Sequence, residues 1–223
     1  MKILLGMKLF PERFPVYSVL ALLSVVFTTA VVLDSAKLLD ERYVTDSAAA
    51  ELQRLQAASR TLDLAIEFGF DPIIVQITEQ LSRDVFRKRK CPSCPTWRWV
   101  DSDRKLTYLI LSIIQIESGG NPRAYNPSGA SGLTQLMYST AIAYDKDLKR
   151  EELLQIPKNL QISVAHFVDL LERYHGNEHL AILAWNRGIV AVARSIALGQ
   201  NTENGYTLKV FEQAALRNAG ELD

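Results

Sequence analysis

Hydrophobic and polar positions divide the chain into one long apolar run and a series of amphipathic stretches. Residues 16–33 contain no charged side chain. As a helix rising about 1.5 Å per residue, this run would be about 27 Å long, close to the ~30 Å hydrocarbon core of a bilayer. Lys2, Lys8 and Arg13 precede it and Asp34 follows it. The positive-inside rule therefore predicts a transmembrane anchor with a cytoplasmic N-terminus and the remaining chain exported.

A cleaved signal peptide is the alternative interpretation of this run. Thr28-Thr29-Ala30 offers small residues at which cleavage is plausible. We favour the uncleaved anchor, because the apolar run is longer than the usual core of a signal peptide. Both interpretations export everything that follows.

Beyond the anchor, apolar residues recur at three- and four-residue steps, which is typical of helices. The first predicted helix is 47–68, with an apolar stripe of Leu52, Leu55, Leu62 and Ile66. We expect this stripe to pack within the chain, with a second copy or a partner protein as alternatives.

Gly69-Phe70-Asp71-Pro72 then breaks the chain and begins a second helix, which runs to about Lys90. This helix ends in the basic run 87–90, which complements the helix dipole. Contact with anionic lipid or wall polymers is the alternative for these cations. Residues 34–100 as a whole are predicted to form a helical linker region.

The C-terminal half is predicted to be a compact helical domain over 101–223. Asp101 or Asp103 caps the first helix, and further helices are expected over 133–144, 147–154, 157–174, 178–186, 190–198 and 205–218. No alternating strand of useful length is visible, and a small β element among the loops of this half remains open. The predicted fold class is all-α.

The most informative stretch is the helix that ends at Glu117. Residues 106–116 are apolar around most of a helix and should be buried on nearly all sides. Gly119-Gly120-Asn121-Pro122 then ends the helix. Burial and the negative end of the helix dipole both raise the pKa of such a carboxyl, as a general acid requires.

No Asp or Glu occurs between Ser118 and Tyr144. Most glycosidases use two carboxylates that flank the scissile bond. A single carboxyl favours a mechanism in which one group acts first as acid and then as base.

These residues resemble the lytic transglycosylase (SLT) family, which is lysozyme-like. The resemblance rests on Glu117-Ser118, on the ungapped run from Pro122 through Gly129-Ala130, Gly132-Leu133 and Gln135, and on Ala184-Trp185-Asn186-Arg187-Gly188. It covers roughly residues 101–215, with Tyr206 before the last helix. Three signatures in order over a hundred residues are specific.

The resemblance implies that Glu117 cleaves the β-1,4 bond between N-acetylmuramic acid and N-acetylglucosamine in peptidoglycan. The muramic C6 hydroxyl then attacks C1 and gives a 1,6-anhydro product. The resemblance also implies that Gln135 begins a helix and that the reaction requires no cofactor or metal. The residues that it implies for substrate binding are Asn126, Ser128, Gln135, Met137, Trp185, Asn186 and Tyr206.

Three positions depart from the family pattern. Thr134 replaces a methionine, Asn126 replaces a serine that orients the glutamate or its ligand, and Trp185 replaces a tyrosine. We expect Thr134 to be tolerated because Met137 is retained. Ser128 is a nearby substitute for the missing serine.

The cysteine, tryptophan and histidine side chains give weaker signals of function. Cys91 and Cys94 are most simply a small disulfide in an exported loop, with redox or metal roles as alternatives. Trp97 and Trp99 either cover the core or stack on sugars. His175 and His179 are four apart, but Gly176-Asn177 should break any shared helix, and His166 is expected to pack. A metal site is not predicted.

The balance of basic and acidic side chains indicates which class of partner to expect. Without residues 1–33 the chain has 22 basic and 24 acidic side chains, so no basic excess points to nucleic acid. The resemblance implies peptidoglycan strands as substrate. Together with the apolar run at 16–33, it predicts a single-pass protein of the bacterial inner membrane with its catalytic domain in the periplasm. A hydrolytic muramidase and a non-cutting glycan-binding scaffold of an envelope or secretion complex are the alternative functions.

Overall fold

The computed structural model describes residues 41–88, 103–201 and 203–218. The predicted anchor at 16–33 and the loop with Cys91, Cys94, Trp97 and Trp99 lie outside these ranges. Within them, no helix combines the length and the apolar character needed to cross a membrane.

The chain divides into two compact units, residues 1–58 and residues 59–223. In the first unit, the described residues form the N-terminal part of helix α2 (Glu41–Phe68), which begins six residues before the predicted start. The second unit holds the end of α2 and every other described element.

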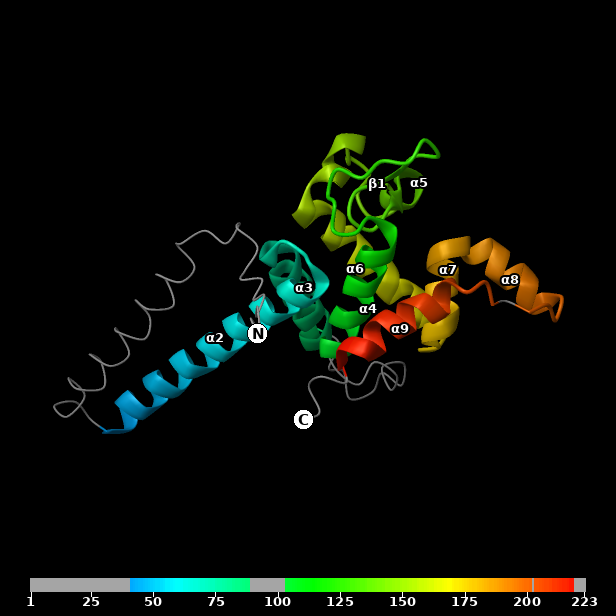
Figure 1. The fold of residues 1–223 in the computed structure, drawn as a ribbon. Helices are drawn as coiled ribbons and strands as arrows, with labels where there is room; N and C mark the ends of the chain where they lie inside the picture. The colour runs from blue at the N-terminus through cyan, green and yellow to red at the C-terminus, as the bar shows by residue number, and fades with distance from the viewer. Residues whose placement is uncertain (1–40, 89–102, 202, 219–223) are drawn as a thin grey trace, which may run out of the picture. The chain divides into compact units, whose positions relative to one another are not determined.

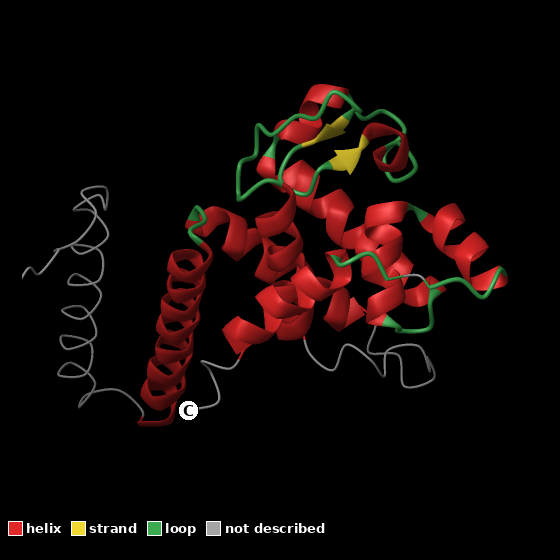
Figure 2. Ribbon diagram, turned by 45° about the vertical axis from the view of Figure 1, so that its right-hand side comes forward, coloured by secondary structure: helices red, strands yellow, loops and turns green. Residues whose placement is uncertain are grey.

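The second unit is mostly helical (Figures 1 and 2). In order, its elements are α3 (Pro72–Lys88), α4 (Asp103–Glu117), strands β1 (Ala130–Ser131) and β2 (Leu136–Met137), α5 (Tyr138–Ala141), the 3-10 helix η3 (Arg150–Leu154), α6 (Ile156–Arg173), α7 (Glu178–Arg187), α8 (Ile189–Ala197) and α9 (Tyr206–Asn218). The predicted helices over 72–90, 157–174, 178–186, 190–198 and 205–218 are confirmed within a residue or two wherever the chain is described.

Helix α4 is the centre of this unit. Every residue from Leu106 to Ile114 is buried, as the sequence predicted. The helix packs against α3 and α9, while α6 packs against α3 and α7. The largest side chains of this core are fully buried and include Ile74, Phe167 and Leu170. Burial on all sides of α4 fixes the position of its C-terminal end, where Glu117 lies.

The buried face of α2 differs from the predicted stripe. Ile66 is 59% exposed and Leu52 is 55% exposed, whereas Leu64, Ala65 and Phe68 are buried in the core. The helix carries two overlapping apolar sets, and its packing within the second unit selects the one that contains Leu64. The choice of Ile66 as an inward residue was wrong, whereas the packing of Leu52, which lies in the first unit, stays a prediction.

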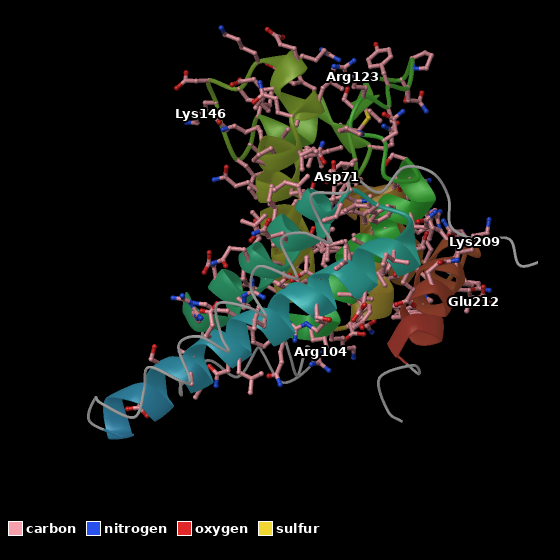
Figure 3. The ribbon with its side chains drawn as sticks, turned by 60° about the vertical axis from the view of Figure 1, so that its left-hand side comes forward. Asp71, Arg104, Arg123, Lys146, Lys209 and Glu212 are labelled. Carbon is pink, nitrogen blue, oxygen red and sulfur yellow. The ribbon has the colours of Figure 1, made fainter. Side chains whose placement is uncertain are left out.

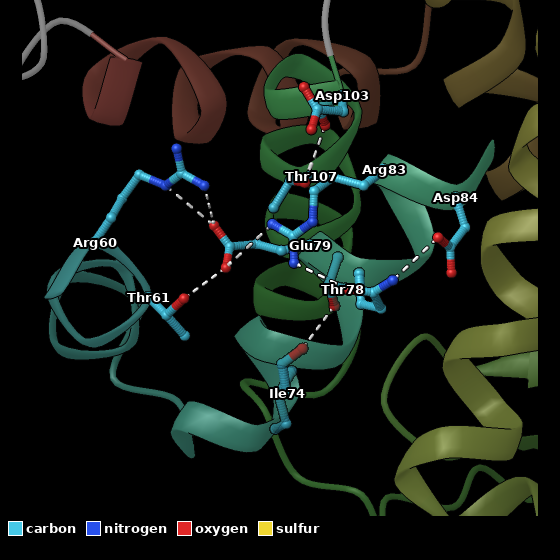
Figure 4. A network of polar contacts seen from close by, with 10 residues as sticks. Arg60, Thr61, Ile74, Thr78, Glu79, Arg83, Asp84, Asp103 and Thr107 are labelled. Carbon is cyan, nitrogen blue, oxygen red and sulfur yellow. Dashed lines mark hydrogen bonds and ion pairs between the residues drawn. The ribbon is translucent and has the colours of Figure 1, made fainter. Parts of the chain in front are cut away.

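A buried carboxylate joins α2 to α3. Glu79 is 5% exposed and accepts hydrogen bonds from Arg60 Nε (3.2 Å), Arg60 Nη2 (3.1 Å) and Thr61 Oγ1 (2.6 Å). Arg83 lies 4.0 Å from the same carboxylate (Figure 4). A buried charge is tolerated when it is paired and hydrogen-bonded in this way.

We expect Glu79→Gln to lower the free energy of unfolding by about 2 kcal/mol, because charge-assisted bonds are replaced by weaker neutral ones. Asp84→Asn on the same helix is the control, since its hydrogen bond from Gln80 is exposed, and should change stability by less than about 0.5 kcal/mol. Denaturant unfolding of the full chain measures both. Equal effects of the two substitutions would show that the buried carboxylate is not a stabilising centre.

The stretch 133–144, predicted to be one helix, is instead mainly turn and strand. β1 and β2 pair antiparallel, with Ala130 opposite Met137 and Ser131 opposite Leu136. Only Tyr138–Ala141 is helical in this stretch. Gly132 and Gln135 have φ values of 77° and 48°, a left-handed conformation that no α-helix contains. The all-α prediction is therefore corrected by one small hairpin, the β element that the sequence left open.

Charged side chains are mostly on the surface. Arg123, Lys146, Lys209 and Glu212 are exposed and point away from the ribbon (Figure 3). Some buried polar groups, such as Thr134 and Asn159, sit close to the hairpin, whereas others, such as Glu79, lie between α2 and α3.

Candidate active site

Glu117 occupies the end of the buried helix α4. Gly119 and Gly120 adopt φ values of 59° and 82° directly after it, and the Gly119 amide donates to the Ile114 and Gln115 carbonyls. This is the predicted glycine termination of the helix. The Glu117 side chain is partly buried, and this desolvation raises its pKa above the ordinary value.

Tyr206, the first residue of α9, supplies the hydrogen bond to this carboxyl. Its Oη donates to Glu117 Oε1 over 2.6 Å, joining residues 89 positions apart. The bond stabilises the charged carboxylate and lowers the Glu117 pKa, but burial has the larger effect and the net shift is upward. Burial and the neighbouring carboxylate raise the pKa of Tyr206, so its hydroxyl remains a donor.

Asn186 is connected to Tyr206 through Asn204. Asn204 Nδ2 donates to Asn186 Oδ1 (2.8 Å), and the Tyr206 amide donates to Asn204 Oδ1 (3.1 Å). The chain of hydrogen bonds therefore runs from the Ala-Trp-Asn signature to Glu117. Asn204 is a site residue that the sequence analysis missed.

Glu203 was missed as well, and it organises the turn before α9. Its carboxylate accepts from the amides of Asn204 (2.9 Å) and Gly205 (2.7 Å) and from Thr207 Oγ1. His179 Nε2 lies 3.3 Å from its other oxygen. The available signal was a polar run, 201–204, immediately before a helix, which is typical of a capping sequence.

The hairpin is joined to the end of α4 by the hydrogen bond from Ser118 to the Leu133 carbonyl, and it corrects the prediction for Gln135. This residue lies in the turn between β1 and β2 and does not begin a helix. Its Nε2 donates to the carbonyls of Ala124 (3.2 Å) and Gly132 (3.0 Å). Both bonds use the nitrogen, so the amide oxygen is the group that Gln135 can present to a ligand.

Asn126 and Ser128 pair with each other. Asn126 Oδ1 accepts from the Ser128 amide and from Ser128 Oγ, both at 2.9 Å, and both residues are exposed. The hydroxyl close to Glu117 in the chain is that of Ser118, which donates to the Leu133 carbonyl over 2.6 Å. Ser118 therefore fastens the end of α4 to the hairpin.

Thr134 has a structural role that explains its departure from the family pattern. Its buried Oγ1 lies 3.0 Å from Asn159 Oδ1 and 2.6 Å from Ser163 Oγ. Asn159 Nδ2 donates to the carbonyls of Ser131 (3.1 Å) and Leu153 (2.9 Å). These bonds tie the hairpin to α6, and nothing in the local sequence indicated them.

Trp185 joins the main core to the smaller cluster under the hairpin, and it packs against residues of both. Its ring lies 5.3 Å from that of His166 and 6.2 Å from that of Phe167. The predicted packing role of His166 is thus confirmed. Met137, on β2, is 40% exposed and remains available to a ligand.

The remaining histidines do not form a metal site. His175 has a φ of 52° between α6 and α7, so it shares no helix with His179. Within the described residues, no three His, Cys, Asp or Glu side chains are grouped so as to hold a metal ion.

The helical fold, the partly buried Glu117 and the three sequence signatures together indicate a family of proteins. Residues 98–206 match the family model described as Transglycosylase SLT domain. This part of the chain belongs to the SLT transglycosylase family, which is lysozyme-like.

Among individual proteins, the chain is similar to a protein described as "Transglycosylase" from Enterobacteria phage PRD1. The two are 36% identical over 80 residues, which cover 36% of this chain and 28% of the phage protein. The match therefore spans less than a third of that relative's length. No solved structure matches the chain.

Proposed function

We propose that this protein is a peptidoglycan lytic transglycosylase that cleaves the β-1,4 bond between N-acetylmuramic acid and N-acetylglucosamine. The observation that carries the proposal is the Glu117 carboxyl, partly buried, with a raised pKa and a hydrogen bond from Tyr206. Its place in an SLT-family region supports the substrate class.

In the first step, protonated Glu117 donates its proton to the glycosidic oxygen as the bond from C1 breaks. The raised pKa favours the protonated form, as general acid catalysis requires. Tyr206 then stabilises the carboxylate that forms, because its Oη donates to Oε1. The bonding electrons leave with the N-acetylglucosamine oxygen, which carries the proton away.

In the second step, the Glu117 carboxylate takes the proton from the muramic C6 hydroxyl. The C6 oxygen attacks C1, closes the 1,6-anhydro ring and restores the protonated Glu117. No water is consumed. The absence of Asp and Glu between Ser118 and Tyr144 fits a mechanism in which the positive charge at C1 is stabilised by the substrate's own N-acetyl group.

Glycan binding is proposed for the residues around this carboxyl. The Gln135 amide oxygen, the exposed Met137 side chain and the Trp185 ring supply polar and apolar contacts. Asn126 and Ser128 contribute through the loop that they brace. Anchoring by residues 16–33 in a bacterial inner membrane, with this domain in the periplasm, is part of the same proposal.

Mass spectrometry of digested peptidoglycan tests the reaction. A lytic transglycosylase leaves 1,6-anhydromuramic ends, whereas a hydrolytic muramidase leaves reducing ends and adds water. Glycan binding without any cleavage would instead identify a non-catalytic scaffold.

Tyr206→Phe is expected to lower kcat about tenfold, because the carboxylate formed in the first step loses its hydrogen bond. The same bond lowers the Glu117 pKa, so its removal raises that pKa further. Activity that depends on protonated Glu117 falls as pH rises through this pKa, and its alkaline limb should therefore move to higher pH. A pH profile of kcat/KM for both proteins measures the shift, and an unmoved or lower limb would contradict this role for Tyr206.

A further inference from the structure

A cavity separate from Glu117 opens between three elements. It has a volume of about 680 Å³ and is lined from the region of α5, from the C-terminal half of α6 and from Ile189 at the start of α8. Neither Glu117 nor Tyr206 lines it. Its size is that of a small-molecule or peptide site.

One wall holds a hydrogen-bonded group of three side chains. Tyr144 Oη donates to Asp169 Oδ2 over 2.8 Å and lies 3.0 Å from His166 Nδ1. The hydroxyl has a single proton, so His166 Nδ1–H must be the donor in the second contact. Burial lowers the His166 pKa and so favours the neutral ring, with the Asp169 charge acting in the opposite direction. His166 Nε2 and the second Asp169 oxygen are therefore hydrogen-bond acceptors.

A cation lines the same cavity one helical turn away. Arg173 follows Asp169 by four residues on α6, a spacing at which opposite charges often pair. Among the ion pairs of the described residues, none joins these two. The lining of the cavity thus includes the carboxylates of Asp169 and Glu172 and the guanidinium of Arg173, with Ala143 and Ile189 as its accessible apolar wall.

We propose that this cavity binds the peptide stem of peptidoglycan, an inference that rests on the proposed function. Arg173 would bind a peptide carboxylate, and Asp169 with His166 would accept from an ammonium or amide N–H. A neutral sugar chain has no charge to match either group. The aliphatic parts of the stem would contact Ala143 and Ile189.

The cavity is also connected to the catalytic region. The His166 ring contacts Trp185 at 5.3 Å, and Trp185 precedes Asn186, which is linked through Asn204 to Tyr206. One wall of the cavity therefore packs on the segment that carries Asn186.

Isothermal titration of the full-length chain with a stem-type tetrapeptide tests the proposal, because this probe has no glycosidic bond. The peptide carries a free diamino acid in third place and a C-terminal D-alanine carboxylate. We expect binding that Arg173→Gln weakens about tenfold or more, the loss of one charge-assisted contact. Arg194→Gln, an exposed arginine on α8 that does not line the cavity, is the matched control and should leave affinity unchanged.

The C-terminally amidated peptide completes a double-mutant cycle. It should bind the wild type about as weakly as Arg173→Gln binds the acid, and Arg173→Gln should not weaken it further. Absence of peptide binding, or equal effects of Arg173→Gln and Arg194→Gln, would overturn the inference, as would displacement of the peptide by a chitin tetrasaccharide. Peptide binding without anhydro products overturns the proposed reaction instead, so the two failures are distinguishable.

Discussion

Glu117→Gln is expected to lower the rate of peptidoglycan cleavage by about 10²–10⁴-fold, the contribution of a general acid. Glutamine has nearly the same shape but cannot give up a proton to the glycosidic oxygen or take one from the C6 hydroxyl. Release of 1,6-anhydro products, followed by mass spectrometry, measures the loss.

The variant should fold normally, because the neutral amide removes the cost of a partly buried charge and can still accept from Tyr206 Oη. Glu212→Gln on α9 is the control, since Glu212 is exposed, and it should retain full activity. Undiminished cleavage by Glu117→Gln would reject Glu117 as the acid and with it the proposed reaction.

Gly132→Ala is expected to lower the free energy of unfolding by about 3–5 kcal/mol, which is at the upper end for single substitutions. A Cβ at this position would lie 2.1 Å from the Leu153 carbonyl oxygen and 2.3 Å from Asn159 Nδ2. The φ of 77° adds strain for any residue with a Cβ. The hairpin or η3 would have to move, and the Asn159 bonds would be lost.

Gly199→Ala separates backbone strain from the clash. Gly199 also has a left-handed φ, of 61°, but a Cβ there meets nothing within 4 Å. Its substitution should cost about 1 kcal/mol, the strain alone. Chemical denaturation of the full chain compares the two, and equal losses would show that the contact between Gly132 and Asn159 is not tight.

Helices were predictable because their signals are local. Buried positions in 157–174 recur every three to four residues, and the structure places Leu160, Val164, Phe167, Leu170 and Leu171 in the core. Asp71 caps α3, with its Oδ1 accepting from the Ile73 amide over 3.0 Å. Such features depend on a few neighbouring residues and can be identified in one chain.

The hairpin was misassigned because its determinants are distant. Leu133, Leu136 and Ala141 have spacings compatible with a helix, and all three are buried. The turn is held by Asn159, which lies 25 residues from Thr134 and 28 from Ser131. The hydrophobic periodicity of a segment does not reveal the contacts that it makes with a side chain of another helix.

The sequence by itself determined a helical domain with Glu117 at the end of a buried helix. Both signals, the apolar periodicity and the glycines that end the helix, come from residues close together in the chain. Only the tertiary structure decided that Asn204 links Asn186 to Tyr206 and that Asp169 and Arg173 line one cavity. These relations depend on how separate helices pack, because hydrogen bonds act over about 3 Å in space whatever the separation along the chain.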